Sequence, residues 1–393
     1  MPPDARAASG SPSRGRALRI AAHNGASTFG GGEKWTLLLL RGLRERGHAV
    51  RFFCRDEAMR DRAAALDVPA EVGRLGGHLM LPDAWRFGGR LRAWRPDALL
   101  VSTFKKLWLA GMAARRAAVP RVVSRIGLST DLPRRHWTYR LALRRWTDAV
   151  LVNADGIRRD FLADLPDLDP RTVVTVYDGI VLGDPPPERA SARRALGLPA
   201  DVPLVGSVTR LSGQKRLDRM LEAVALLDGV HLALAGVGEL EGALRERAGR
   251  PDLAGRVHFL GFREDVPTVL GALDAFLLTS DKEGMANAML EAMEAGVPVV
   301  STPVSGAAEA LEGPVEPWGE APGVVVEATP VAVAAATRRI LAGPGLRRAM
   351  GEAGRERVRR RFSYPAMLHA WEHVLAGGDP GAVHQGPSPV DGG

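Results

Sequence analysis

The feature that most constrains the fold is a repeated alternation of short apolar runs with longer segments of helical apolar spacing. An apolar run at 17–22 is followed by a helix-period segment at 34–46 and by a second run at 48–53. Further runs of the same kind stand at 98–102, 121–124, 149–153 and 173–176. Apolar runs that alternate with helices are typical of a parallel sheet covered by helices on both faces. The sequence therefore predicts a doubly wound α/β fold.

Three consecutive prolines interrupt this alternation, which then begins again. They are Pro185, Pro186 and Pro187. The second series of apolar runs covers 204–208, 231–235, 257–260, 275–278 and 297–301. With 393 residues the chain is also too long for one ordinary core. We therefore predict two Rossmann-like domains, 17–184 and 185–360, that face a central cleft.

Both ends of the chain lie outside this pattern. Residues 1–16 are polar and lack the apolar stretch of a secretory signal peptide, which predicts a disordered leader. An amphipathic helix is expected within 361–376, where it could pack back on the N-terminal domain. Residues 377–393 are rich in Gly and Pro, a composition that predicts a disordered tail.

Cysteine content and charge limit the classes of protein that fit. Cys54 is the only cysteine, so no intramolecular disulfide can form, and a cytoplasmic protein is expected. It follows an apolar pair, and we expect it to be buried. No run approaches the roughly 18 to 20 apolar residues that a membrane span needs. The net charge of +8 is concentrated in the first half, since residues 1–190 hold 32 basic against 20 acidic side chains.

The most informative stretch for function is 280–300. A predicted strand ends near Thr279, a polar loop with a glycine follows, and a helix is expected to begin around Ala286. Backbone N–H groups at such a helix start suit a diphosphate. Those expected to serve are the N–H groups of Gly284, Met285, Ala286, Asn287 and Ala288.

Two acids flank these N–H groups. Glu283 precedes the expected helix and Glu291 lies about two turns into it, so the two are expected roughly 8 to 12 Å apart. Such a pair could bracket a nucleotide sugar, with one carboxylate at the sugar and one at the ribose. Two solvent-facing helix acids are the alternative that the residues alone leave open.

These residues carry a family resemblance. Glu283-Gly284, Asn287, 290–292 and 296–300 resemble the Glu-x7-Glu signature of the retaining, group 1 glycosyltransferases of GT-B fold. The resemblance implies that Glu283 contacts hydroxyls of the donor sugar and that Glu291 holds the ribose hydroxyls. Ala286 departs from the family pattern, in which Pro is frequent at this position.

The segment 205–216 also resembles the family, through its Gly-Arg-Leu…Lys element. The resemblance implies that Arg210 and Lys215 neutralise the diphosphate leaving group. Gly236 stands in a turn similar to a family strand-end turn, and Arg263 stands where the family borders the nucleobase. Because Gly236-x-Gly238 lacks the third glycine of a dinucleotide fingerprint, NAD binding is disfavoured.

The N-terminal half carries a second glycine-rich loop, which resembles the acceptor-side loop of the family. Its candidate residues are Gly30, Gly31, Gly32 and Lys34, and a plain tight turn is the alternative. After the apolar run 121–124 the family often has a catalytic-site His or Asp. This sequence has no His there, which leaves Asp131 as a weak candidate.

The resemblance implies transfer of a hexose-type sugar from a nucleotide diphosphate sugar, with retention and without a metal ion or other cofactor. A UDP-sugar is the favoured donor and a guanosine diphosphate sugar the alternative. The acceptor is expected to be a hydroxyl, for example of a lipid-linked or cell-envelope glycan. The competing functions are a nucleotide-sugar epimerase of the same fold, a non-catalytic nucleotide-sugar-binding protein and, less favoured, an oxidoreductase.

A basic segment suggests where the protein works. The stretch from Arg134 to Arg145 is rich in arginine and includes Trp137, a composition that suits an anionic membrane surface. A surface helix that packs its apolar side chains on the sheet is the alternative. We thus expect a cytoplasmic protein that can lie at the inner face of the membrane. No nucleic-acid-binding motif accompanies the basic residues, so nucleic acid is not an expected partner.

Overall fold

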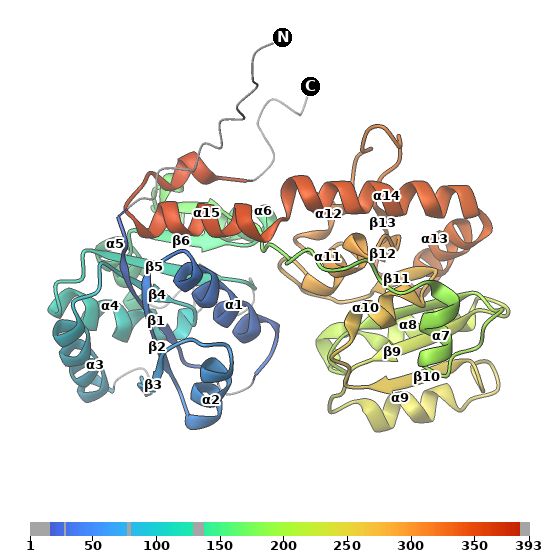
Figure 1. The fold of residues 1–393 in the computed structure, drawn as a ribbon, viewed down its shortest axis with the longest axis horizontal. Coiled ribbons are helices and arrows are strands. Elements are labelled where there is room, and N and C mark those ends of the chain that lie inside the picture. The colour runs from blue at the N-terminus through green and yellow to red at the C-terminus, as the bar shows by residue number, and fades with distance from the viewer. Residues whose placement is uncertain (1–15, 27–28, 77–79, 129–136, 386–393) are drawn as a thin grey trace, which may run out of the picture. The chain divides into compact units, whose positions relative to one another are not determined.

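The computed structural model describes residues 16–26, 29–76, 80–128 and 137–385, and its elements form two parallel sheets (Figure 1). The first sheet has the order β3-β2-β1-β4-β5-β6-β7. Its strands are β1 (Arg19–Asn24), β2 (Ala49–Cys54), β3 (Ala70–Val72), β4 (Ala98–Val101), β5 (Arg121–Ile126), β6 (Ala149–Val152) and β7 (Val173–Thr175). The helices of this half are α1 (Gly31–Glu45), α2 (Glu57–Ala65), α3 (Leu81–Trp94), α4 (Leu107–Arg116), α5 (Trp137–Trp146) and α6 (Asp155–Asp164), with 3-10 turns η1 (Phe104–Lys106) and η3 (Pro170–Thr172).

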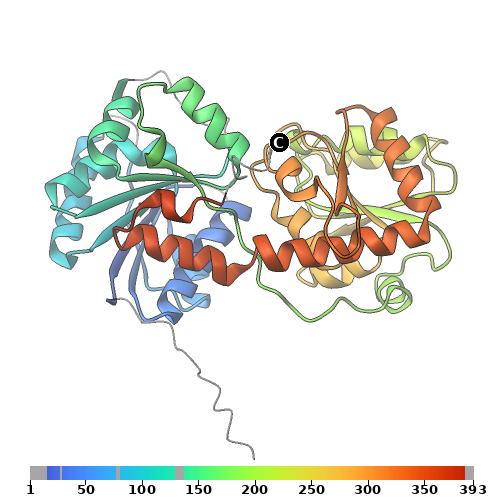
Figure 2. The ribbon, with the colours of Figure 1, turned by 90° about the horizontal axis from the view of Figure 1, so that it is seen from above.

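The second sheet has the order β10-β9-β8-β11-β12-β13. Its strands are β8 (Leu204–Val208), β9 (His231–Ala235), β10 (Val257–Gly261), β11 (Ala275–Leu278), β12 (Val299–Ser301) and β13 (Gly323–Val325). The helices of this half are α7 (Arg189–Ala195), α8 (Leu217–Ala225), α9 (Glu241–Ala248), α10 (Val266–Gly271), α11 (Asn287–Glu294), α12 (Ala307–Leu311), α13 (Pro330–Ala342), α14 (Pro344–Arg361) and α15 (Tyr364–Leu375), with 3-10 turns η4 (Gly213–Lys215) and η5 (Pro380–Val383). Figure 2 shows α14 and α15 as consecutive helices with a bend between them.

The predicted fold class is confirmed, because the two sheets have the strand orders of doubly wound Rossmann-like folds. In the second sheet α11 and α8 cover opposite faces, and each contributes to a separate apolar cluster. The α11 cluster includes Phe276 and Met289, and the α8 cluster includes Val205 and Met220. Each buried strand therefore packs on both faces, which explains its continuous apolar sequence.

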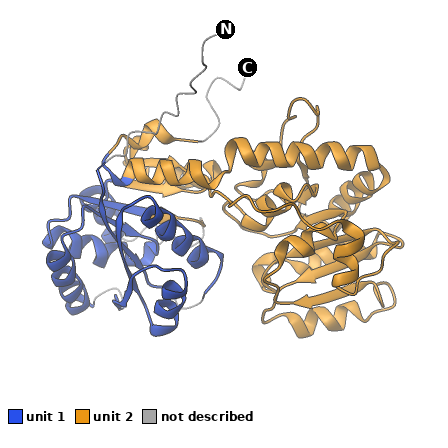
Figure 3. Ribbon diagram, viewed as in Figure 1, with its two compact units in different colours: residues 1–124, 137–148, 375–377 blue, residues 125–136, 149–374, 378–393 orange. Residues whose placement is uncertain are grey.

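Contacts divide the chain into two compact units (Figure 3). Unit 1 comprises 1–124, 137–148 and 375–377, and unit 2 comprises 125–136, 149–374 and 378–393. The predicted boundary at residues 184 and 185 lies between β7 and β8, where one sheet ends and the other begins. In unit 1, Cys54 at the end of β2 is fully buried, as predicted, and burial raises the pKa of its thiol.

The C-terminal segment differs from the disordered tail predicted for 377–393. The carbonyl of Thr175 in β7 accepts a hydrogen bond from the N–H of Gln385 at 2.9 Å, and His384 Nδ1 accepts from the N–H of Thr175 at 3.0 Å. The prediction rested on Gly and Pro content, which carries no information on whether His384 and Gln385 can hydrogen-bond to the edge of a strand. Residues 386–393 and 1–15 lie outside the described part of the chain.

The predicted C-terminal helix is α15. It begins beside an isolated parallel bridge between Ile180 and Ser363, and the N–H of Tyr364 donates to the carbonyl of Ile180 at 3.1 Å. The chain thus returns to the segment that follows β7. Among the described helices, none has both the length and the apolar character that crossing a membrane would require.

Candidate functional site

The predicted donor-site residues follow neighbouring strands of the second sheet. Because β8, β9, β10 and β11 are parallel, the loops after them emerge at one edge. These loops are joined by backbone hydrogen bonds, from Thr209 to the carbonyl of Ala235 at 2.9 Å and from Gly236 to the carbonyl of Gly261 at 2.7 Å. Sheet topology thus brings four separate sequence motifs to a common edge.

Lys215 and Glu283 meet at this edge. The turn η4 after β8 positions Lys215, whose Nζ forms an ion pair with Oε1 of Glu283. Ser280, just after β11, donates its hydroxyl to the same carboxylate oxygen at 2.7 Å. The Glu283 side chain is only 11% exposed and that of Lys215 24%, so this ion pair is sheltered from water. The structure therefore unites the predicted cation and the predicted first acid.

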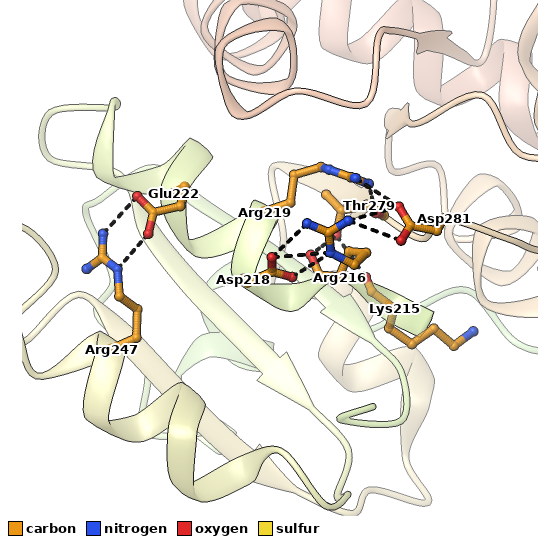
Figure 4. A network of polar contacts seen from close by, with 8 residues as sticks. All are labelled: Lys215, Arg216, Asp218, Arg219, Glu222, Arg247, Thr279 and Asp281. Carbon is orange, nitrogen blue, oxygen red and sulfur yellow. Dashed lines mark hydrogen bonds and ion pairs between the residues drawn. The ribbon is translucent and has the colours of Figure 1, made fainter. Parts of the chain in front are cut away.

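A second layer of polar contacts holds the Lys215 and Glu283 loops against each other (Figure 4). Arg219 of α8 donates to the carbonyl of Thr279 at 2.7 Å and to Asp281 at 2.8 Å. The Thr279 hydroxyl donates to the backbone carbonyl of Lys215 at 3.1 Å. Although partial desolvation opposes it, hydrogen bonds from Arg219 and Arg216 hold the pKa of Asp281 below its ordinary value. In Figure 4 the Lys215 side chain extends away from this network. The network therefore holds the backbone of the Lys215 loop and leaves its side chain to pair with Glu283.

The helix start after Glu283 provides hydrogen-bond donors. Helix α11 begins at Asn287, one residue later than predicted, and its N-cap Ala286 offers no side-chain acceptor. Within the described residues, the backbone N–H groups of 284–288 have no hydrogen-bond acceptor. Met285 and Ala286 are buried, so these two donors are shielded from water. This is the arrangement that the sequence predicts for a diphosphate.

Gly284 is required by its neighbours. A Cβ atom there would overlap the carbonyl oxygen of Gly127 and Oδ1 of Asn153. Oδ1 of Asn153 is buried and has no hydrogen-bond partner in the described structure, and the same holds for Oδ1 of Asn287. Two amide oxygens with unused acceptor capacity therefore lie on residues that surround the loop or begin its helix.

Gly236 allows a close approach between two loops of the predicted donor site, and its predicted contact with the nucleotide stays a prediction. Its φ of 143° lies outside the range that side chains favour, and a Cβ atom would overlap the carbonyl oxygen of Thr209. Gly236 therefore allows the β9 turn to approach the loop that carries Arg210. Arg210 is exposed, and within the described residues its side chain has no hydrogen bond or ion pair.

Arg263 and Glu291 are the remaining residues of the predicted donor site. Arg263 forms an ion pair with Asp265 at 2.7 Å. The two hydrogen bonds that Arg263 donates to this carboxylate raise the pKa of Arg263. Glu291 is the fifth residue of α11 and is half-buried. Neither residue's predicted contact with a nucleotide is tested by the structure, so both stay predictions.

A buried polar cluster near the site was not predicted from the sequence. Arg125 at the end of β5 donates to Asp178 at 3.0 Å, and Asn153 at the end of β6 donates to the same carboxylate at 2.7 Å. All three side chains are buried. The sequence signal that could have revealed this cluster is a polar residue at the end of an apolar strand, where both Arg125 and Asn153 stand.

The glycine-rich loop of unit 1 caps a helix. The N–H of Gly30 donates to Glu33 at 3.0 Å, and the carbonyl of Gly30 accepts from the N–H of Lys34 at 3.0 Å. Helix α1 begins at Gly31, so Gly31, Gly32 and Lys34 belong to its first turns. Their predicted acceptor role stays a prediction, and Asp131 lies outside the described residues. No group of three or more possible metal ligands is found in the part of the chain that the structure describes.

Two Rossmann-like domains and a Glu-x7-Glu loop at the carboxyl edge of the second sheet define the protein as a GT-B glycosyltransferase. A family model described as Glycosyl transferases group 1 matches residues 188–357, and one described as Glycosyltransferase Family 4 matches 29–183. The chain is 32% identical over 261 residues to the lipopolysaccharide core biosynthesis glycosyltransferase LpsE of Rhizobium meliloti, covering 65% of this chain and 69% of that protein. The chain belongs to the group 1 glycosyltransferase family.

Further relatives and solved structures agree with this assignment. The lipopolysaccharide core biosynthesis glycosyltransferase LpsD of Rhizobium meliloti is 26% identical over 88% of this chain and 94% of its own. The crystal structure of HepE from Anabaena in complex with UDP has a TM-score of 0.80 at 20% identity, covering 92% of this chain and all of that one. WaaG, a glycosyltransferase involved in lipopolysaccharide biosynthesis, has a TM-score of 0.69 at 19% identity over 91% and 100% of the two chains. At these identities the two solved structures bear on the fold alone.

Proposed function

We propose that this glycosyltransferase moves a hexose-type sugar from a nucleotide diphosphate sugar to a hydroxyl acceptor, with retention and without a metal ion. The observation that carries the proposal is the sheltered pair of Lys215 and Glu283 beside the N–H groups of 284–288. Cationic and N–H donors at one loop suit a diphosphate, and a carboxylate beside them suits sugar hydroxyls.

The main electrostatic task is to stabilise the leaving diphosphate. As the bond from the anomeric carbon to the diphosphate oxygen breaks, negative charge grows on that oxygen. Lys215, the N–H groups of 284–288 and, in the proposal, Arg210 supply positive potential without an ion. The acceptor oxygen bonds to the anomeric carbon on the face that the diphosphate leaves, and its proton passes to the departing phosphate.

Donor binding then requires a change of partners at Lys215. Its Nζ is paired with Glu283 in the structure, so a diphosphate has to compete with that carboxylate. Once Lys215 turns to the phosphate, the Glu283 carboxylate is available to accept hydrogen bonds from the sugar hydroxyls. Ser280, which donates to the same oxygen, keeps the carboxylate oriented.

Relatives support a cell-envelope acceptor and leave two donor bases to compare. LpsE and LpsD are named for lipopolysaccharide core biosynthesis. The solved structure of HepE is a complex with UDP, whereas a relative from Corynebacterium glutamicum, 32% identical over 204 residues, is named as a GDP-mannose-dependent mannosyltransferase. We propose a UDP-sugar as donor, with a GDP-sugar as the competing choice.

The surface of α5 supports a location at an anionic membrane. Trp137, Arg140, Arg144 and Arg145 recur at helical spacing on one side of α5, and Tyr139 on the other side is buried. Trp137 is 64% exposed, which an exclusively structural packing role would not require. Tryptophan among arginines suits the headgroup region of an anionic bilayer.

Two measurements test the proposal. Thermal unfolding with a panel of nucleotide diphosphates and their sugars should show a raised midpoint for UDP ligands, because a ligand that binds only the folded state stabilises it. Turnover of the stabilising donor should continue in excess chelator. Loss of turnover that Mg²⁺ or Mn²⁺ restores would contradict metal independence, and inversion at the anomeric carbon would contradict retention.

The membrane proposal has its own measurement. The protein should co-sediment with anionic vesicles at low salt, and less with zwitterionic ones. Trp137→Ala should weaken this binding, whereas Trp94→Ala, a tryptophan on α3 of the same unit, should leave it unchanged. Absence of binding to anionic vesicles at low salt would rule the membrane surface out.

A further inference from the structure

A cavity of about 340 Å³ lies at the edge of the second sheet opposite the donor loops. Its walls include Asp274, which immediately precedes β11, and Pro298, which immediately precedes β12. The strands are parallel, so residues before them lie at the amino edge and the donor loops at the carboxyl edge. Helix α14 completes the wall with Arg347, Arg348 and other residues of its first three turns.

One buried carboxylate serves several arginines on this wall. Oδ1 of Asp274 pairs with Arg189 at 3.0 Å and Arg347 at 3.1 Å, and Oδ2 pairs with Arg193 at 2.8 Å. Oδ2 also accepts the N–H of Leu204 at 2.9 Å. With two donors on each oxygen, Asp274 has little capacity left. A single negative charge therefore faces three guanidinium groups.

The opposite part of the wall adds further positive charge. Arg355 donates to Glu352 at 2.6 Å and to the carbonyl of Ala295 at 3.0 Å, and its guanidinium lies against the backbone of Gly296. Arg348 is exposed into the cavity wall, and within the described residues its side chain has no hydrogen bond or ion pair.

The charge around the cavity does not balance. The lining arginines are Arg189, Arg347, Arg348 and Arg355, whereas Arg193, which also pairs with Asp274, is buried and does not line the cavity. The lining acids are Asp274 and Glu352, and Glu294 of α11, which is not a lining residue, interacts with Arg355. Four lining cations thus face two lining anions around one hollow, and the amino end of the 18-residue helix α14 adds its positive potential.

We propose that this cavity binds a small phosphate-bearing anion at a site separate from the donor loops. Guanidinium groups form paired hydrogen bonds with phosphate oxygens, so the lining arginines suit a phosphate. Arg189, half-exposed, and Arg348 retain donors for such a ligand, while Asp274 and Glu352 hold their neighbours in place. The volume accommodates a hexose phosphate as well as inorganic phosphate.

Thermal unfolding of the full chain tests the site with two probes, inorganic phosphate and glucose 1-phosphate, at constant ionic strength. We expect each probe to raise the midpoint of the wild type. Arg348→Gln should lose at least half of that gain without loss of basal stability, because Arg348 supports no other described group. Arg339→Gln on α13 is the matched control, since it removes an equal charge outside the cavity and should keep the full gain.

Lys215→Ala separates this site from the donor loops, where phosphate could also bind. The proposal requires the gain to persist in Lys215→Ala and to fall in Arg348→Gln. A gain that is lost only in Lys215→Ala, or that is equal in Arg348→Gln and Arg339→Gln, would overturn it, whatever the outcome of the donor assays. A gain with glucose 1-phosphate at tenfold lower concentration would identify an organic phosphate as the ligand, and equal gains would identify free phosphate.

Discussion

At the residue scale, Lys215 does two things in sequence. In the structure it neutralises Glu283, and in the proposed reaction it stabilises the departing diphosphate. Its replacement therefore affects the carboxylate as well as the leaving group. A neutral side chain at this position leaves the Glu283 carboxylate, which is only 11% exposed, with the Ser280 hydroxyl as its remaining described partner.

We predict that Lys215→Ala lowers kcat by about 10²- to 10³-fold, the usual cost of removing one donor to developing oxyanion charge. Lys282→Ala is the matched control, since Lys282 is an exposed lysine of the Glu283 loop. We expect it to change kcat less than about twofold, because an isolated surface charge contributes little. Steady-state kinetics with the stabilising donor measures both, and equal rates in the two variants would contradict the role of Lys215.

In the proposed reaction Glu291 binds the ribose equally well in the ground state and the transition state, because the ribose hydroxyls stay neutral throughout. We predict that Glu291→Ala raises the donor KM about tenfold and leaves kcat within about threefold, the pattern of lost uniform binding. Glu291→Gln retains an acceptor oxygen and should recover part of the affinity. A lowered kcat at unchanged KM in Glu291→Ala would instead place the residue in the chemical step.

Gly284 should not tolerate a side chain. We predict that Gly284→Ala lowers the free energy of unfolding by about 1 to 3 kcal/mol, as overpacking does, and also lowers kcat/KM, because the loop has to leave Gly127 and Asn153. Gly213→Ala is the control, since an added Cβ there meets no atom within 4 Å. Chemical denaturation of both variants should separate them, and equal stability would contradict the contact.

At the element scale, helix α6 depends on a distant residue. Its N-cap Ala154 has no capping side chain, and the N–H groups of Asp155 and Gly156 donate to the two oxygens of Glu309 on α12 at 2.9 and 3.0 Å. Burial raises the pKa of Glu309, against the effect of these same hydrogen bonds. Helix α12 thus fixes the start of α6.

We predict that Glu309→Ala lowers the free energy of unfolding by about 1 to 2 kcal/mol, the usual cost of removing a cap and leaving partly buried donors unpaired. Glu312→Ala, an exposed acid one residue beyond α12, should change it by less than about 0.5 kcal/mol. Urea denaturation measures both. A Glu309→Ala protein as stable as Glu312→Ala would show that α6 needs no such cap.

The elements also show how far the sequence could predict this structure. Strands β8, β9 and β11 have the bounds that their apolar runs predict, because each run is buried on both faces and ends at a polar or glycine residue. Strands β3 and β13 were not predicted, since three residues at a sheet edge are too few to give a periodic signal. Helix α1 starts three residues before the predicted Lys34, because Gly30 and Glu33 cap it.

The site was predictable where a single stretch of sequence carried it. The loop from Ser280 to Ala288 and its donors follow from a strand, a glycine and a helix start. The pair of Lys215 and Glu283 needed the order of β8 and β11 in the sheet, which a single sequence does not give. The Arg125, Asn153 and Asp178 cluster needed three strand ends to meet, and it was missed for the same reason.

At the scale of the whole molecule, the C-terminal segment protects a sheet edge. Strand β7 is the last strand of the first sheet, and an uncovered edge strand leaves its N–H and C=O groups without partners. Gln385 and His384 supply those partners through Thr175, and Oε1 of Gln385 also accepts the N–H of Tyr177 at 2.9 Å. Residues more than two hundred positions apart thereby close one sheet.

We predict that a chain ending at Gly378 is less stable than one ending at Gln385 by about 1 to 3 kcal/mol, since each lost hydrogen bond costs about 1 kcal/mol. The chain ending at Gln385 is the control and should match the full chain.

Burial lowers the pKa of His384 below its ordinary 6.5, and its Nδ1 accepts a hydrogen bond only when neutral. Below pH 6.5 the unfolded chain binds the extra proton, so this stabilisation should fall as the pH decreases from there toward the lowered pKa, and the chain ending at Gly378 should lack that decrease. Urea denaturation of the two shortened chains over this pH range measures both effects. Equal denaturation midpoints for the two chains at pH 7.5 would show that β7 needs no covering segment.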